Sequence, residues 1–271
     1  MLAASSPEVG RRLQRAQALT LAAQMRAMPA WVDAGVIEAD GCCAALARGD
    51  LGRKLNHVVG FGLAGPPDPD LLPRLEAAYA ERGLRTEIDL CPHADPGALR
   101  ILTARNYRPT DFSNAYVRDA RLEPPAEIPG LTVRIVGPAD HEALIAASVA
   151  GFSVQARPRP PELLEALARS ALARPDTTTV LCEIDGEVAG SAAVSILDGA
   201  VAYLHMASVL PACRGRGVQG ALIRARLQIA AAAGADLALI SSRLDNVSAR
   251  NAERAGFTLA YTEVTLAGPA P

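Results

Sequence analysis

The segment RGRGVQGALI (residues 214–223) holds the residues whose types and spacing most clearly suggest chemistry. Gly215, Gly217 and Gly220 form the pattern G-x-G-x-x-G, which in many proteins marks a turn that binds a phosphate. Glycine adopts positive φ angles without steric cost, so consecutive N–H groups of such a turn can point towards one anion. A helix expected to begin near Gly217 adds the positive end of its dipole. The segment therefore predicts a pyrophosphate site.

The residues around these glycines decide which phosphate compound fits. Arg214 and Arg216 add positive charge to the turn. A dinucleotide-binding turn would follow its strand directly, and a further series of strand–helix units would come after it. Here Pro211 begins an intervening segment, and only about 50 residues follow Gly220. These features exclude a dinucleotide site, and a tight strand–helix turn without a ligand is the remaining alternative.

Composition excludes several classes of partner. The chain has 271 residues, a formal net charge of −2 and no block of like charge, which does not favour nucleic acid or an anionic membrane. The five cysteines have no metal-binding spacing and the histidines number four, so no metal site is expected. We expect His57, His93 and His141 at the surface. The sequence has no apolar run of about 20 residues and no signal-peptide pattern, so the expected location is cytoplasmic.

The elements expected after residue 131 place the glycine turn between a strand and a helix. Asp-Gly pairs at 185–186 and 198–199 each separate two strand-like runs, which predicts a three-stranded antiparallel meander over residues 177–210. The pattern further predicts strands at 131–136, 236–242 and near 259–266, and helices from 138–140 onward and at 161–173, 217–233 and 247–255.

The first part of the chain repeats the end of the second. It is expected to form strands at 57–63, 86–91 and 112–119 and helices at 71–83 and 95–107. Three prolines and a glycine at 121–131 mark the boundary, so we predict two related units at residues 1–122 and 131–271. Chance recurrence of strand–helix order is the alternative. In place of the glycine turn the first part has AGPPDPD (64–70), whose prolines lack N–H donors and whose aspartates repel phosphate.

Two stretches of the second part resemble the GNAT N-acetyltransferases. Residues 209–223 are similar to the acetyl-CoA motif of that family, Q/R-x-x-G-x-G/A after a strand. Arg214 and Gly217 match its first two fixed positions, whereas Gln219 stands where Gly or Ala is usual. Residues 245–257 resemble the next motif, a helix that ends in Gly-Phe. The resemblance implies an α/β (α+β) fold with a mixed, mostly antiparallel sheet flanked by helices, here with a related N-terminal half.

The same resemblance implies acetyl-CoA as co-substrate, and no metal. In the family the strands before and after the loop helix splay apart, and the pantetheine arm inserts between them. Carried over, the backbone of two strand residues pairs with pantetheine, the loop holds the pyrophosphate, and three polar residues line the adenylate or thiol side. The set is Ala207, Val209, Arg214, Gly215, Arg216, Gly217, Val218, Gln219, Gly220, Asn246, Ser248 and Asn251.

The strand AVAYLHMASV (200–209) supplies the candidate catalytic residues. Alternation places Tyr203, His205, Ala207 and Val209 on one face. Serotonin-type acetyltransferases of the family carry histidines four and six residues before the matching valine, where this chain has His205 and Tyr203. His205 is the candidate general base, since imidazole titrates in the useful range. A hydrogen-bonded sheet residue without a catalytic role is the alternative.

The general acid is open. Many family members carry Tyr in the helix before Gly-Phe, where this chain has Ala252. Ser248, Asn251, Tyr261 or water could serve instead, or the thiolate could leave unassisted. The resulting prediction is an acetyl-CoA-dependent N-acetyltransferase that acts by direct transfer on a small-molecule or peptide amine, with a homodimer left open. The alternative is a non-catalytic CoA- or acyl-CoA-binding sensor.

Overall fold

The computed structural model describes residues 4–120, 128–153, 159–197, 200–244 and 246–270. The chain divides into two compact units: residues 1–117, 241–250 and 257–271 form the first, and residues 118–240 and 251–256 form the second. Most of the boundary expected at 121–131, and the Asp-Gly pair expected at 198–199, lie outside the described residues.

Among the residues that the structure describes, the first unit combines the helices α1, α2 and α3 with six strands. Its strands follow the order β1-β2-β3-β4-β11-β5. Neighbouring strands are antiparallel, except that β3 and β4 run parallel. The elements are α1 (Pro7–Arg26), β1 (Gly35–Ala39), β2 (Cys42–Leu46), β3 (His57–Val59), α2 (Leu71–Ala80), β4 (Glu87–Leu90), α3 (Pro96–Ala104), β5 (Arg108–Asp119) and β11 (Thr258–Ala267), with short 3₁₀ helices at Ala30–Val32, Gly49–Leu51 and Arg53–Leu55.

The C-terminal strand lies in the first unit. β11 pairs with β4 through Val264 and Leu90, and with β5 through Thr262 and Asn114. The expected division at 131–271 assigned this strand to the second part of the chain. Strand pairing over such a sequence distance is set by tertiary contacts, which local pattern does not report.

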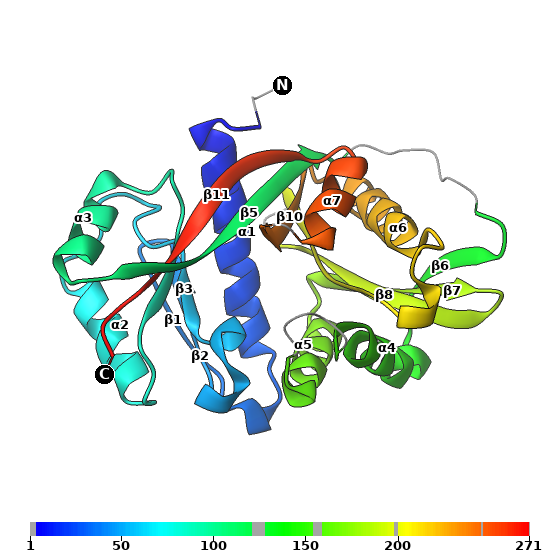
Figure 1. The fold of residues 1–271 in the computed structure, drawn as a ribbon, viewed down its shortest axis with the longest axis horizontal. Helices are drawn as coiled ribbons and strands as arrows, with labels where there is room; N and C mark the ends of the chain where they lie inside the picture. The colour runs from blue at the N-terminus through cyan, green and yellow to red at the C-terminus, as the bar shows by residue number, and fades with distance from the viewer. Residues whose placement is uncertain (1–3, 121–127, 154–158, 198–199, 245, 271) are drawn as a thin grey trace. The chain divides into compact units, whose positions relative to one another are not determined.

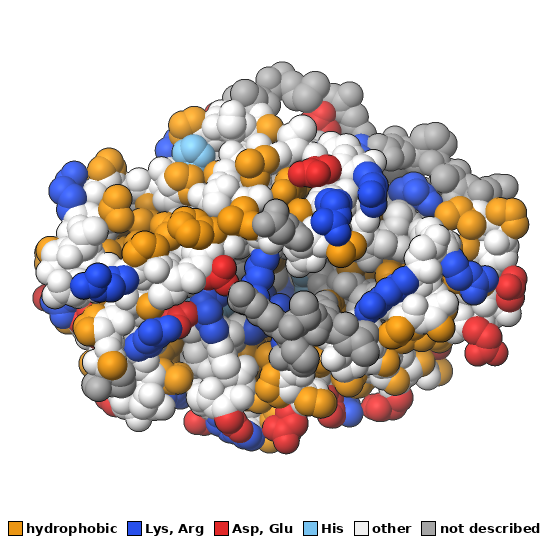
Figure 2. Space-filling model, viewed as in Figure 1, with side chains coloured by type: hydrophobic (Ala, Val, Ile, Leu, Met, Phe, Trp, Pro, Cys, Tyr) orange, Lys and Arg blue, Asp and Glu red, His pale blue; other side chains and the backbone are white. Residues whose placement is uncertain are grey.

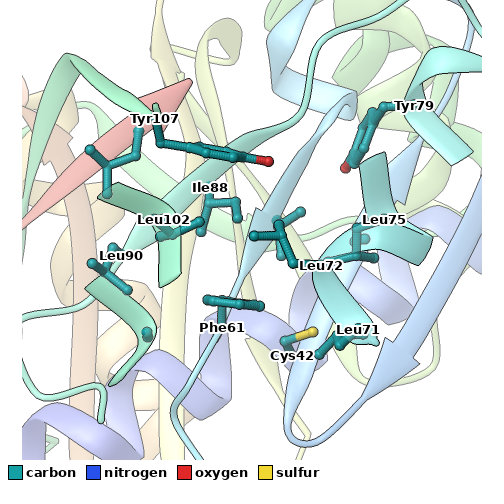
Figure 3. Close-up of a cluster of buried hydrophobic side chains, with 14 of the residues drawn as sticks. Cys42, Phe61, Leu71, Leu72, Leu75, Tyr79, Ile88, Leu90, Leu102 and Tyr107 are labelled. Atoms are coloured by element: carbon teal, nitrogen blue, oxygen red, sulfur yellow. The ribbon is translucent and has the colours of Figure 1, made fainter. Parts of the chain in front are cut away.

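The core of the first unit lies between α2, α3 and one face of the sheet. Figure 3 shows Leu72 and Leu75 of α2 in one cluster with Ile88 of β4 and Leu102 of α3. Tyr79 is buried in the same cluster and donates its hydroxyl hydrogen to Ala45 O at 2.8 Å. This arrangement buries the apolar face of α2 and satisfies its one buried hydroxyl group.

Strand β3 is shorter than expected because glycine changes the backbone direction. The sequence predicts a strand at 57–63, but β3 ends at Val59. Gly60 and Gly62 have φ angles of +85° and +72°. A Cβ atom at Gly60 would lie 2.6 Å from Gly41 O, so this position requires glycine.

The other face of the first sheet carries buried polar groups. His57, expected at the surface, is buried, and burial lowers its pKa to about 4. Asp89 forms an ion pair with Arg53 and accepts a hydrogen bond from Thr265 Oγ1 at 2.6 Å. Glu263 accepts from Ser113 Oγ at 2.6 Å. Burial, followed by the negative charge of Asp89, raises the pKa of Glu263 to about 7.

The second unit contains a mixed sheet with helices on both faces. Its strands follow the order β10-β9-β8-β7-β6, antiparallel except for the parallel pair β9–β10. Figure 1 and the packing clusters place α4 and α5 on one face and α6 on the other. The elements are β6 (Leu131–Ile135), α4 (His141–Ser153), α5 (Pro161–Ala173), β7 (Thr177–Ile184), β8 (Glu187–Ile196), β9 (Val201–Val209), α6 (Val218–Ala232), β10 (Leu237–Arg243) and α7 (Val247–Arg254), with 3₁₀ helices at Pro138–Asp140 and Pro211–Cys213. The division between the units falls within β5, β10 and α7.

The fold class expected from the sequence is confirmed. The meander β7-β8-β9 is present, and Asp185 and Gly186 have the positive φ angles, 53° and 86°, that a two-residue hairpin turn requires. The same succession of strands and helices occurs twice along the chain, first as β3-α2-β4-α3-β5 and later as β9-α6-β10-α7-β11. The related N-terminal half is therefore visible in the order of elements.

The helices and the exposed hydrophobic side chains bear on how the surface contacts its surroundings. Within the described ranges, none of the helices is long and apolar enough to cross a membrane. Hydrophobic side chains lie along the face where β5 and β11 run, in Figure 2. Phe112 and Leu259 on these strands remain 46% and 48% exposed.

The raised pKa of Glu263 predicts a pH-dependent stability. A carboxyl whose folded-state pKa lies above its unfolded value adds stability below the unfolded pKa, near 4.5, and loses it as pH rises through about 7. Between pH 5 and pH 8, the unfolding free energy of the unaltered protein should fall by on the order of 2 kcal/mol because of Glu263. In Glu263→Gln this decrease should be absent. Urea unfolding at both pH values measures it.

The control for this experiment is Glu81→Gln, because Glu81 is exposed at the end of α2. Its pH dependence should equal that of the unaltered protein. Equal pH dependence in Glu263→Gln and the unaltered protein would contradict the assignment.

Candidate active site

The candidate site is organised by a bulge in β9. Met206 has a φ angle of +55°, which is unusual for a residue other than glycine. The register between β8 and β9 shifts at the same place, from Ser191 opposite Ser208 to Ala193 opposite His205. One residue of β8 therefore faces two residues of β9, as in a β-bulge.

The bulge moves the two halves of the predicted site to opposite faces of the sheet. His205 contacts Ser195 on the face covered by α4 and α5. Ala207 and Val209 pack instead with the cluster under α6. The expectation that Tyr203, His205, Ala207 and Val209 share one face is wrong, because regular alternation fails at Met206.

A buried arginine holds the bulge from the α6 side. Arg226 is 1% exposed, and its Nη1 atom donates to His205 O at 3.3 Å and to Ala193 O at 3.4 Å. Its Nε atom donates to Leu222 O at 2.9 Å. Burial lowers the pKa of Arg226 to about 9. In the part of the chain that the structure describes, no carboxylate pairs with Arg226, so strand and helix carbonyls stabilise the guanidinium.

The ladder between β9 and β10 is short. The two strands pair in parallel from Val201–Leu237 to Tyr203–Leu239, whereas β9 continues to Val209. Beyond Tyr203, β9 thus has backbone groups on this edge that the β9–β10 ladder does not use. The end of the β9–β10 pairing at Tyr203 agrees with the prediction that the two strands splay apart.

The glycine turn follows β9 and leads into α6. Gly215 and Gly217 have φ angles of +78° and +83°, as their residue type predicts. Arg214, Gly215, Arg216 and Gly217 are exposed, and a Cβ atom at Gly215 would meet open space. Arg214 Nη2 donates to Gly151 O at 3.4 Å, which holds this side chain near the end of α4.

The N-terminus of α6 has no side-chain cap. Its N-cap residue is Gly217, and the first backbone hydrogen bond in this region that reaches back to it comes from Ala221 N, at 3.1 Å to Gly217 O. Across the described residues, the N–H groups of residues 215–220 form no hydrogen bond with the protein. Val218 is buried under the sheet, while Gln219 and Gly220 are half-buried. Exposed, uncapped N–H groups of a helix N-terminus favour an anion.

The corresponding helix of the first unit has the opposite charge at its N-terminus. Asp68 and Asp70 are exposed there, and Asp68 Oδ1 accepts from Asp70 N at 3.0 Å. A carboxylate therefore already satisfies a backbone donor at the start of α2, and both carboxylates oppose a second anion. This supports the expectation that the first unit does not hold a pyrophosphate in this way.

The remaining predicted residues lie on or beside α7. Asn246 Oδ1 accepts from Ser248 N at 3.1 Å and so caps the helix. The division between the units places Asn246 and Ser248 in the first and Asn251 in the second, so their relation to the glycine turn stays a prediction. Ala252 is fully buried, and Tyr261 donates its hydroxyl hydrogen to Gln14 Oε1 at 2.8 Å inside the first unit.

His205 has a hydrogen-bonding neighbour that sequence reasoning missed. Its Nε2 atom lies 2.7 Å from Ser195 Oγ, and its ring lies 5.5 Å from that of Tyr203. Ser195 lies on β8 directly opposite Tyr203. No motif marks this serine, because only the strand register brings it to the histidine. Within the described chain, no group of three or more His, Cys, Asp or Glu could hold a metal ion.

Comparison with known proteins identifies the domain. A family model described as "Acetyltransferase (GNAT) family" matches residues 144–257. Among curated proteins, no sequence matches the chain. The match spans β9, the glycine turn and the helix that ends in Gly-Phe.

Solved structures share the fold of the whole chain at low sequence identity. A GCN5-related N-acetyltransferase from Kribbella flavida is 21% identical, with a TM-score of 0.65, over 96% of both chains. A functionally unknown conserved protein from Staphylococcus epidermidis is 12% identical, with a TM-score of 0.60, over 89% of this chain and 96% of that one. A tandem GNAT protein from the clavulanic acid biosynthesis pathway is 17% identical, with a TM-score of 0.57, over 78% of this chain and 70% of that one.

These similarities confirm the tandem GNAT resemblance at the level of the fold. Both the family match and the similar structures agree with the order of strands and helices derived above. Residues 144–257 of this chain therefore form an acetyltransferase domain of the GNAT family.

Proposed function

We propose that this protein is an N-acetyltransferase that transfers the acetyl group of acetyl-CoA directly to an amine of a small molecule or peptide. The observation that most supports this is the uncapped N-terminus of α6, with its exposed N–H groups and two arginines, at the end of the strand that bears His205. A single strand thereby links an anion site to a titratable side chain.

The second unit fits CoA through its backbone. The N–H groups of residues 215–220 would hold the pyrophosphate, assisted by Arg214 and Arg216. The backbone of Ala207 and Val209 would pair with the pantetheine arm along the edge of β9. Gln219 departs from the family pattern only in its side chain, and its N–H group remains available. Acetyl-CoA supplies the activated thioester.

The expected cofactor set also includes polar residues on or beside α7, of which only Asn251 belongs to the second unit. Asn246, Ser248 and Asn251 would line the adenylate or thiol side. Ala252 leaves this helix without the tyrosine of many family members, so another group or water protonates the departing thiolate, or the thiolate leaves unassisted.

His205 is the proposed general base. An acceptor amine must lose a proton before its nitrogen attacks, and a neutral imidazole accepts that proton at physiological pH. Tyr203 lies beside His205 on the same face and would orient the acceptor. The bulge at Met206 keeps this face apart from the side on which Ala207 and Val209 pack.

Release of free thiol from acetyl-CoA with a panel of small amines and peptides tests the proposal. Amine-dependent release supports transfer. Tight binding of CoA without release for any amine would contradict it and would favour a CoA- or acyl-CoA-binding sensor.

Substitution of Gly217 should weaken CoA binding. Alanine at a φ angle of +83° is strained, and its Cβ atom would lie 2.8 Å from Ile128 Cδ1, so the turn or the Ile128 side chain must shift. We expect Gly217→Ala to raise the Kd for CoA roughly tenfold, because a cost of about 1.4 kcal/mol on the bound geometry corresponds to that factor. Isothermal titration calorimetry measures the change.

Gly234→Ala is the matched control for this substitution. Gly234 follows α6 at its other end, has a φ angle of +82° and has open space around a Cβ atom. The two variants should lose similar stability, while the Kd for CoA changes only in Gly217→Ala. An equal Kd in both variants would contradict a pyrophosphate site at the turn.

Removal of the proposed base should slow transfer. His205→Ala should lower kcat/KM on the order of 10²-fold, because the amine proton then has no positioned acceptor. Steady-state kinetics with the best amine of the panel measures the effect, and His141→Ala at the start of α4 is the control. A kcat/KM in His205→Ala within a factor of about two of that control would overturn the role of His205.

A further inference from the structure

A chain of hydrogen bonds connects His205 to the carboxylate of Asp176, the residue before β7. His205 Nε2 lies 2.7 Å from Ser195 Oγ, and Ser195 Oγ lies 2.7 Å from Thr177 Oγ1. Thr177 Oγ1 donates to Asp176 Oδ1 at 2.8 Å. Arg174 Nη2 lies 2.7 Å from the same carboxylate oxygen. All five residues belong to the second unit.

The fold holds this chain in place through adjacent strands. Thr177 on β7 stands opposite Ser195 on β8, and Ser195 stands opposite Tyr203 on β9. The backbone of Asp176 accepts a hydrogen bond from Ile196 N at 2.9 Å. Ser195 is fully buried, and the side chain of Arg174 is 3% exposed. Burial of Ser195 strengthens the two hydrogen bonds of its hydroxyl group, because water does not compete for that group.

The carboxylate of Asp176 fixes the donor and the acceptor of every hydrogen bond in this series. A carboxylate only accepts, so the single hydroxyl hydrogen of Thr177 is donated to Asp176. Thr177 must then accept from Ser195, and Ser195 must accept from His205. The remaining donor is the Nε2–H group of the imidazole. Neutral His205 therefore carries its proton on Nε2 and its lone pair on Nδ1.

We propose that Asp176, Thr177 and Ser195 are positioning residues that fix the Nε2–H tautomer of His205 and so make Nδ1 the basic nitrogen. This inference rests on the proposed function only in taking His205 as the general base. Asp176, Thr177 and Ser195 act through His205 and contact neither substrate.

The chain gives the base two properties. It fixes the ring orientation, because Nε2 is tied to a buried hydroxyl group of β8. It also keeps an acceptor at Nε2 after Nδ1 has taken the amine proton, so the imidazolium remains hydrogen-bonded, with the charge of Asp176 at the far end. Hydrogen-bond partners behind metal-ligating histidines commonly contribute about 10- to 100-fold, and we expect an effect at the lower end of that range here.

The tautomer is measurable without a known acceptor. Long-range ¹H–¹⁵N correlation spectra show which imidazole nitrogen carries the proton, and comparison with His205→Gln assigns the signals of His205 among the four histidines. We expect Nε2 protonated and Nδ1 unprotonated in the unaltered protein. The opposite tautomer there would overturn the proposal.

Three variants test the chain itself. In Thr177→Val, Ser195 loses its acceptor and can donate to Nε2, so the population of the Nδ1–H tautomer should rise. Thr177→Ser retains the hydroxyl group and should restore the original tautomer. Ser195→Ala removes the partner of Nε2 and should give a mixture. An unchanged tautomer in both Thr177→Val and Ser195→Ala would contradict the proposal.

Kinetics separates this inference from the proposed function. With an amine that supports transfer, Thr177→Val should lower kcat/KM roughly tenfold, and Thr177→Ser should recover it. If His205 has the Nε2–H tautomer but the protein acetylates no amine, the positioning role of the hydrogen-bonded residues is supported and the proposed function is contradicted. If the protein acetylates an amine but His205 has the Nδ1–H tautomer, the proposed function is supported and the positioning role is overturned.

Discussion

The bulge at Met206 is the constraint on which the rest of the site depends. It turns β9 so that His205 faces α4 and α5 while Ala207 and Val209 face α6. Without the extra residue, a strand would place all of these side chains on one face. The buried guanidinium of Arg226 donates to strand carbonyls on both sides of the bulge. Because isolated buried charge is costly, this arginine makes the irregular backbone and the helix α6 interdependent.

Charge at helix N-termini distinguishes the two related halves. The N-terminus of α6 offers exposed N–H groups with arginines beside them, whereas exposed aspartates surround that of α2. The same order of strands and helices thus supports an anion site in one half and opposes it in the other. Strand β11 belongs to the compact unit of the first half, where its Glu263 and Thr265 contribute to the buried polar groups near Asp89. The buried polar groups of the first unit therefore come partly from the C-terminal strand.

Local patterns predicted those parts of the fold that local backbone preferences determine. The Asp185–Gly186 turn needs positive φ angles, and α5 begins with a proline at its first position. Both features could therefore be predicted from the sequence. The glycine turn was predictable for the same reason. The bulge was not, because nothing in the residue type of Met206 signals a positive φ angle. The burial of His57, the pairing of β11 and the partnership of Ser195 with His205 arise from tertiary contacts between distant segments, which residue patterns do not encode.

The central claim is that the backbone of residues 215–220 binds the pyrophosphate of CoA. Amide hydrogen exchange with and without CoA tests it most directly, because these N–H groups make no hydrogen bond within the described protein. On CoA binding, amide exchange should slow in peptides that cover residues 215–220 and stay unchanged in peptides that cover residues 64–70 of the first half. Unchanged exchange at 215–220 in the presence of saturating CoA, or protection confined to 64–70, would contradict it.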